Sequence, residues 1–394
     1  MIYLDHNATT PVDPRVREEM LPYFTEIFGN PSSLHSFGRE AKEALEKARV
    51  RVAHLISANP EEIFFTGSGT EADNLAIKGI ACYHKNRGKH IITAAIEHHA
   101  VLSCVSALER EGFKVTYIMP KKDGIVSADD VLSAVSPETI LISIMTANNE
   151  TGAIQPIKEI GQRLAEYNNG KTTKDKVYFH TDAVQAVGKI PFNVDELQVD
   201  MASLSGHKIY GPKGVGAIYI RQGSRISPIT YGGPHERGMR PGTENIPGIV
   251  GFGRAAEIAN LELYKMEEVK KLRDLLEGGI LERISDIQIN GSREMRLPTT
   301  TSISFSGVFS EALLTHLDQK GIAVSSGSAC SSSSSEASHV LKNIGLSKEE
   351  AFSTLRFSLG TENTGEEIKF VISTVQEAID QLRGKVTIYP FEVQ

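Results

Sequence analysis

The chain has 394 residues, too many for one compact hydrophobic core, so we expect two domains. Its composition, 40% hydrophobic and 23% charged, is that of an ordinary globular protein, and a net charge of −7 without a basic stripe gives no support for nucleic-acid binding. The N-terminus lacks the charged and apolar segments of a signal peptide, and no apolar run reaches membrane-spanning length. We therefore expect a cytoplasmic protein.

The first part of the chain alternates between helical and strand-like segments. Helical spacing of apolar residues predicts helices over 39–56, 71–83, 99–111 and 157–167. Apolar runs predict strands over 62–66, 90–95, 115–119, 140–145, 177–180, 199–204 and 215–220. This alternation predicts an α/β fold with a mainly parallel sheet covered by helices, whose ligands bind at the carboxyl ends of the strands.

Turn-forming residues between 232 and 243 end this first region. Beyond them, we predict one long helix over 250–284, a strand over 300–305, and helices over 311–319 and 366–382. Together these elements predict a smaller α+β domain. A serine-rich loop covers 325–335.

The three cysteines are too few and too widely spaced for a disulfide framework or a zinc site, and we predict no metal site. Cys82 and Cys104 lie in helical apolar stretches, where cysteine packs as a small hydrophobic residue. Cys330 lies among serines, which bury little apolar area, so it is not expected in the core. It is either a chance cysteine in a solvated loop or a functional thiol.

Lys208 is the first candidate for chemistry. It ends the run Ser205-Gly206-His207-Lys208, directly after one strand-like segment and shortly before another. A lysine held between two buried strands is partly desolvated, and its amine is then available to attack a carbonyl and form a Schiff base. Taken alone, the pattern is explained better by an ordinary lysine at a strand end. The choice between this interpretation and a Schiff-base lysine therefore depends on motifs elsewhere in the chain.

Other strand ends carry polar residues that suit a cofactor. The turn 67–71 opens a helix whose free N–H groups could bind a phosphate, although a plain turn explains it equally well. Asp182 follows an apolar strand and needs a partner, either as a helix cap or as the counter-ion of a ring nitrogen. The pair His98-His99 caps a helix, or one ring stacks on an aromatic cofactor. Asn149 fits a turn or a ligand contact.

Together, a phosphate cradle, a buried Asp182, a polar Gln185, a histidine and an imine-forming Lys208 at successive strand ends meet the needs of pyridoxal 5'-phosphate. The lysine would bind the cofactor aldehyde. The aspartate would keep the pyridine nitrogen protonated, so that the ring withdraws electrons from the substrate.

The chain resembles the cysteine desulfurases of the NifS/IscS group, a class-V aminotransferase branch of the fold-type I pyridoxal phosphate enzymes. This resemblance implies a large, mainly parallel α/β/α domain over 15–250 that binds the cofactor, and a smaller α+β domain formed by 1–14 and 251–394. The resemblance rests on Asp182 and Gln185 and on the segments 3–11, 29–33, 70–71, 97–98, 148–150, 205–208, 235–240, 325–330 and 356–360.

The resemblance also implies a role for each site residue. Lys208 would hold the cofactor through an imine and later abstract the substrate's Cα proton. His98 would stack on the ring and assist proton transfer, Asp182 would pair with the ring nitrogen, and Gln185 would bind the ring hydroxyl. Arg356 would bind the substrate carboxylate as a bidentate fork, with Asn149 beside the cofactor and the substrate. The phosphate would be held by Gly69, Thr70, Ser205 and His207, with Thr243 contributed by the neighbouring subunit of a homodimer.

By the same resemblance, the Cys330 thiolate would attack the sulfur of L-cysteine, leaving a persulfide on Cys330 and releasing L-alanine. The sulfur would then pass to an acceptor such as an iron–sulfur scaffold protein. A selenocysteine lyase, an aminotransferase of the same class and a non-catalytic scaffold that keeps the fold remain as alternatives. The segment after Leu382 is shorter than the one through which housekeeping members dock their scaffold, so the sequence leaves the docking mode and the sulfur acceptor open.

Overall fold

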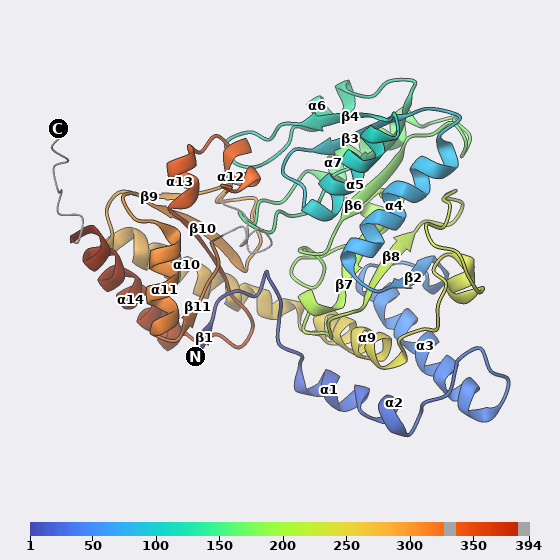
Figure 1. Ribbon diagram of the computed structural model, residues 1–394, viewed down its shortest axis with the longest axis horizontal. Coiled ribbons are helices and arrows are strands. Elements are labelled where there is room, and N and C mark those ends of the chain that lie inside the picture. The colour runs from blue at the N-terminus through green and yellow to red at the C-terminus, as the bar shows by residue number, and fades with distance from the viewer. Residues whose placement is uncertain (327–335, 385–394) are drawn as a thin grey trace, which may run out of the picture.

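The computed structural model describes residues 1–326 and 336–384 (Figure 1). Its larger half is built on a seven-stranded sheet in the order β2-β8-β7-β6-β5-β3-β4, which confirms the mainly parallel α/β prediction. Only β8 runs antiparallel to its neighbours in that sheet. The strands are β2 (Ile63–Thr66), β3 (His90–Ala94), β4 (Lys114–Ile118), β5 (Thr139–Ser143), β6 (Tyr178–Asp182), β7 (Met201–Ser205) and β8 (Gly216–Ile220).

Helices cover both faces of this sheet. On one face, α4 (Gly69–His84) and α5 (His99–Arg110) bury apolar residues against the strands. On the other face, the apolar cluster is formed mainly by α3 (Ser36–Leu55), α6 (Ala128–Ser133), α7 (Ile157–Tyr167) and α9 (Ile246–Leu261). The shorter helices of this half are α1 (Pro14–Met20), α2 (Pro22–Thr25) and α8 (Val194–Leu197).

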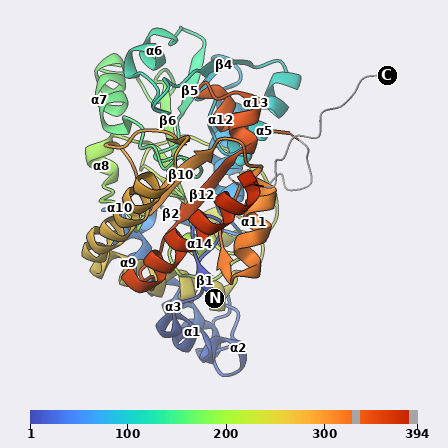
Figure 2. The same cartoon turned by 90° about the vertical axis from the view of Figure 1, so that its left-hand side faces the viewer.

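The smaller half is built on an antiparallel sheet in the order β12-β10-β9, from β9 (Ile287–Ile289), β10 (Thr300–Phe305) and β12 (Thr354–Ser358). Figure 2 shows the helices of this half in front of that sheet: α10 (Met266–Arg283), α11 (Ser310–Gln319) and α14 (Gly365–Gly384). Strand β1 (Ile2–Tyr3) pairs with β11 (Ile322–Ala323), so the N-terminus belongs to this half, and Leu4 lies in its core.

Two short helices, α12 (His339–Asn343) and α13 (Lys348–Phe352), lie between the halves and pack against the larger core. The division at residues 14/15 and 250/251 stays a prediction. None of the described helices is long and apolar enough to cross a membrane.

Two sequence predictions are wrong. The helix predicted over 250–284 is two helices, α9 and α10, separated by a short turn at Leu263–Lys265. The apolar pattern continues through this turn, but Ile258 packs into the larger core and Val269 into the smaller one, so the chain has to change direction between them. Cys82 is exposed on the last turn of α4, whereas Cys104 is buried as predicted.

Candidate active site

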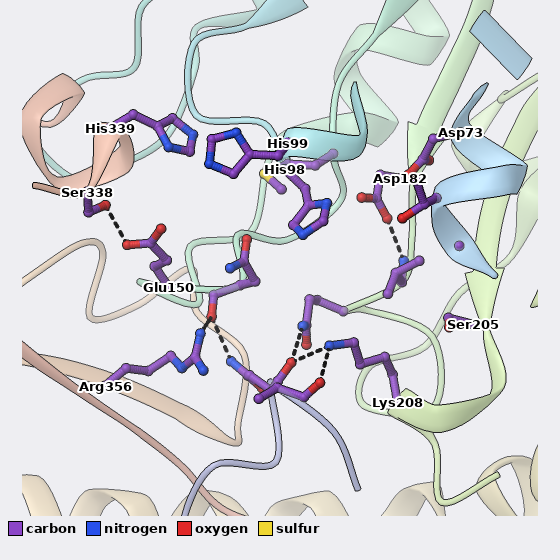
Figure 3. Close-up of a pocket in the computed structure, with 18 of the residues that line it drawn as sticks. Asp73, His98, His99, Glu150, Asp182, Ser205, Lys208, Ser338, His339 and Arg356 are labelled. Carbon is purple, nitrogen blue, oxygen red and sulfur yellow. Dashed lines mark hydrogen bonds between the residues drawn. The ribbon is translucent and has the colours of Figure 1, made fainter. Parts of the chain in front are cut away.

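Five strand ends meet at one edge of the large sheet, because β2, β3, β5, β6 and β7 all run in the same direction. A cavity of about 490 Å³ opens at this edge, between the two halves of the protein (Figure 3). The predicted residues that line it are Gly69, Thr70, His98, Asn149, Asp182, Gln185, Ser205, His207, Lys208 and Arg356.

Two predicted residues are not among them. Thr243 is exposed in a loop away from this cavity, and its contribution to a neighbouring subunit stays a prediction. Cys330 lies outside the described residues. The residues on either side of the undescribed stretch 327–335 are informative, because Ser325 pairs with Arg356 through two backbone hydrogen bonds, and Glu336 lines the cavity.

Lys208 is placed by a single turn of 3-10 helix, Gly206–Lys208, that begins directly after β7. Its Nζ donates to the carbonyl oxygens of Asn7 at 2.5 Å and of Ala8 at 2.8 Å. These carbonyls belong to the N-terminal segment, which crosses the cavity from the smaller half (Figure 3). The amine is therefore held in place at the cavity wall by backbone groups.

Asp182, the last residue of β6, is 6% exposed. Burial raises its pKa to about 6, although Oδ1 accepts the Val184 N–H at 2.9 Å and the Lys208 charge lies nearby. Behind it, the carboxyl of Asp73 on α4 is also buried, and burial together with the Asp182 charge raises its pKa well above its ordinary value. A cationic N–H in the cavity would offset the burial of the Asp182 carboxylate.

His98 is the N-cap residue of α5, and its Nδ1 accepts the Ala100 N–H at 3.1 Å. Burial, with smaller contributions from the charges of Lys208 and His99, lowers the pKa of His98 to about 4. The ring is therefore neutral at physiological pH, and because Nδ1 accepts a hydrogen bond, the hydrogen lies on Nε2. His98 thus brings an N–H donor to the cavity.

The start of α4 forms the anion-binding end of the cavity. Ser68 caps the helix by accepting the Glu71 N–H, and the first-turn N–H groups of this long helix favour negative charge. A Cβ at Gly69 would lie 2.8 Å from Val184 Cγ2, so this close approach requires glycine. Thr70 and Ser205 line the cavity beside this turn. The arrangement suits a phosphate.

Arg356 reaches the cavity from β12 of the smaller half. Its Nη1 donates to the Asn149 carbonyl at 3.0 Å, and its Nη2 lies 2.6 Å from Asp5 Oδ1. Its Nε is buried and has no hydrogen-bond partner among residues 1–326 and 336–384. An unsatisfied buried guanidinium N–H is costly, so this atom fits a bound carboxylate.

Sequence reasoning missed several residues that line or support the cavity. Asn7 lies within the segment 3–11 and Glu150 adjoins Asn149, so their positions in the sequence could have indicated that both line the cavity. Asp73 reads as an ordinary helix residue, and Lys189 as a surface lysine in a turn. Burial, which the sequence does not reveal for single polar residues, is what distinguishes these last two.

Comparisons with known proteins agree with this site. A family model described as aminotransferase class V matches residues 2–371. The chain is 49% identical over 392 residues to cysteine desulfurase IscS of Dictyoglomus turgidum, with 99% of this chain and 97% of the relative covered. It is 50% identical over 385 residues to the enzyme of the same name from Clostridium botulinum (strain Hall), with 97% and 95% covered.

The chain is a cysteine desulfurase of the class-V aminotransferase family. Among solved structures, this cysteine desulfurase superposes on a NifS-like protein with a TM-score of 0.89 at 41% identity, covering 96% of this chain and 99% of that protein. It also matches a structure titled SspA in complex with cysteine, with a TM-score of 0.81 at 38% identity and coverage of 92% and 100%. The predicted family, fold class and activity are confirmed.

Enzymes of this family depend on pyridoxal 5'-phosphate, which confirms the predicted cofactor. The residues present fit it. The turn at Gly69 leaves room for a phosphate, the buried Asp182 carboxylate suits a protonated ring nitrogen, and Lys208 lines the same cavity.

Proposed function

We propose that this cysteine desulfurase transfers the sulfur of L-cysteine to Cys330 and then to an acceptor of iron–sulfur cluster assembly, in the cytoplasm. One observation carries the proposal. The residues flanking the stretch that contains Cys330 lie at the wall of the cavity that holds Lys208, on one side at Ser325 beside Arg356 and on the other at Glu336. The two described ends of this stretch therefore lie beside residues of this cavity.

The side chains of the cavity divide the chemistry between them. When bound, pyridoxal phosphate supplies an aldehyde that reacts with the amino group of cysteine and a ring that withdraws electrons from Cα. Arg356 binds the substrate carboxylate through Nε, with the Asn149 backbone fixing the guanidinium. Lys208 takes the Cα proton on Nζ, and His98 donates from Nε2.

The sulfur transfer balances without an external oxidant. The Cys330 thiolate attacks the substrate sulfur, an S–S bond forms, and the Cβ–S bond breaks. The electron pair of that bond remains on the substrate carbon skeleton, and a proton returns to Cβ. The products are a persulfide on Cys330 and L-alanine.

We further propose a homodimer in which Thr243 of each subunit contacts the phosphate in the other. Thr243 is exposed in its own subunit. The loop that carries it is fixed by Glu236, whose carboxylate forms a buried 2.8 Å pair with Arg49. Several large apolar side chains are exposed near the N-terminal helices, as expected for a surface that a second copy covers: Leu21, Phe24, Phe28, Leu34 and Phe37.

Replacement of Cys330 by serine tests the sulfur-transfer proposal. We expect Cys330→Ser to abolish the protein persulfide, detected by alkylation and mass spectrometry, and to reduce alanine formation from L-cysteine with a reductant present. The exposed Cys82 provides the matched control, because Cys82→Ser should leave both signals unchanged. Full alanine formation by Cys330→Ser would refute the role of Cys330, and a rate that depends on an added keto acid would indicate an aminotransferase.

A further inference from the structure

Lys189 is the least expected side chain near the active site. It lies in the turn after β6 and is 6% exposed. Its Nζ donates to Gln185 Oε1 at 2.6 Å and to Asn7 Oδ1 at 3.1 Å. No carboxylate pairs with it among residues 1–326 and 336–384, and a buried ammonium without a counter-ion is strongly disfavoured.

The surroundings of this amine disfavour its charged form. Burial, followed by the charges of Lys208 and Arg356, lowers the pKa of Lys189 well below its ordinary value. Both oxygens that accept its N–H groups belong to uncharged amides. Lys189 lines a small cavity of about 60 Å³ rather than the active-site cavity, so it acts on the site through its two partners.

The first partner is Gln185. Because its Oε1 faces Lys189, its Nε2 points the other way and donates to the Asn7 carbonyl at 2.9 Å. Gln185 lines the active-site cavity, its oxygen is taken by Lys189, and its Nε2 makes one hydrogen bond within residues 1–326 and 336–384, which leaves a second N–H. Without Lys189, rotation of the Gln185 amide could exchange the positions of Oε1 and Nε2.

The second partner is Asn7. Its Oδ1 faces Lys189, so its Nδ2 donates to the Asn149 carbonyl at 3.0 Å and to Thr300 Oγ1 at 2.9 Å. The same Asn149 carbonyl accepts from Arg356. The Asn7 backbone carbonyl, in turn, accepts from Lys208. One buried amine therefore fixes the side-chain amides of Gln185 and Asn7, and the Asn7 backbone in turn contacts Lys208.

We propose that Lys189 is a positioning residue, which orients the Gln185 and Asn7 amides so that Gln185 offers an N–H to the ring hydroxyl oxygen of the cofactor. This inference rests on the role proposed for Gln185. A donor at that oxygen stabilises its deprotonated form, so Lys189 sets the pH at which the cofactor changes its ionisation and its colour.

The test is a pH titration of the absorbance of the bound cofactor in holoenzyme variants. Lys189→Met keeps the length of the side chain and removes both donors. We expect its absorbance midpoint to rise by about one pH unit, the effect of losing one hydrogen bond to a charged oxygen. Gln185→Ala should shift the midpoint similarly, and the double variant should shift no further, because both changes remove the same contact.

The controls separate positioning from folding. Lys158→Met removes an exposed lysine and should leave the midpoint unchanged. Melting of the cofactor-free variants reports whether each one folds. If Lys189→Met does not fold, Gln185→Ala still decides, since an unmoved midpoint in that variant overturns the inference.

Two further results would also overturn it: a wild-type midpoint in folded Lys189→Met, or additive shifts in the double variant. Either would leave the proposed function intact. A wild-type protein that binds no cofactor, or that releases no sulfur from cysteine, would instead refute the proposed function itself.

Discussion

Glu150 offers a direct test of how burial affects this active site. Its carboxyl is 5% exposed, and Oε2 accepts the Ser338 hydroxyl at 2.6 Å, at the start of α12. Burial raises its pKa from an ordinary 4.5 to about 7, against the lowering effects of Ser338 and Arg356. Between these two values, Glu150 keeps its proton in the folded protein but has lost it in the unfolded chain. Ionisation therefore stabilises the unfolded chain, and the free energy of unfolding falls as pH rises from 4.5 to 7.

The magnitude follows from the shift. About 2.5 pKa units at about 1.36 kcal/mol each give ~3 kcal/mol lost between pH 4.5 and 7. Glu150→Gln keeps an oxygen for Ser338 but cannot ionise, so its stability should not fall over this range. At roughly 2.1 cal/mol/K of unfolding entropy per residue, the melting temperature of the variant should gain about 4 °C on the wild type.

Scanning calorimetry of both proteins without cofactor, from pH 4.5 to 8, measures this difference. The difference should grow up to pH 7 and then level off. Glu349→Gln, an exposed substitution on α13, controls for the general effect of removing a carboxyl. If the melting temperatures of Glu150→Gln and wild type differ by a constant amount from pH 4.5 to 8, Glu150 ionises as easily in the fold as in water.

Three further substitutions test the cavity. Asp182→Asn removes the anion opposite the ring nitrogen, and we expect cofactor binding to weaken at least about tenfold in a fluorescence titration; an unchanged dissociation constant would contradict this. Gly69→Ala places a Cβ 2.8 Å from Val184 Cγ2 and should also weaken cofactor binding, whereas Gly278→Ala, at a position with open space around it, should not. Arg356→Lys loses the Nε–H donor, so the KM for cysteine should rise about tenfold in steady-state kinetics, and an unaltered KM would exclude this carboxylate site.

Several features could be predicted from the sequence because they depend on local patterns. The helix at Ile157–Tyr167 and the strand at Thr300–Phe305 have the bounds that their apolar spacing predicts. The strand-end motifs carry most of the candidate site, because parallel strands bring their carboxyl ends to one edge, and Asp182 and Lys208 meet there. The short elements β1 and β11 carry too few residues for any periodic signal.

The sequence by itself determined the α/β alternation, the position of Lys208 at a strand end and the family. Only the tertiary structure decided which polar side chains are buried, and with which partners. Lys189 and Asp73 look like surface residues in the chain, and they acquire their properties when segments far apart in sequence exclude water from them. Local spacing does not encode that exclusion, because it arises where α4 packs on the sheet around Asp73 and where the N-terminal segment contacts Lys189.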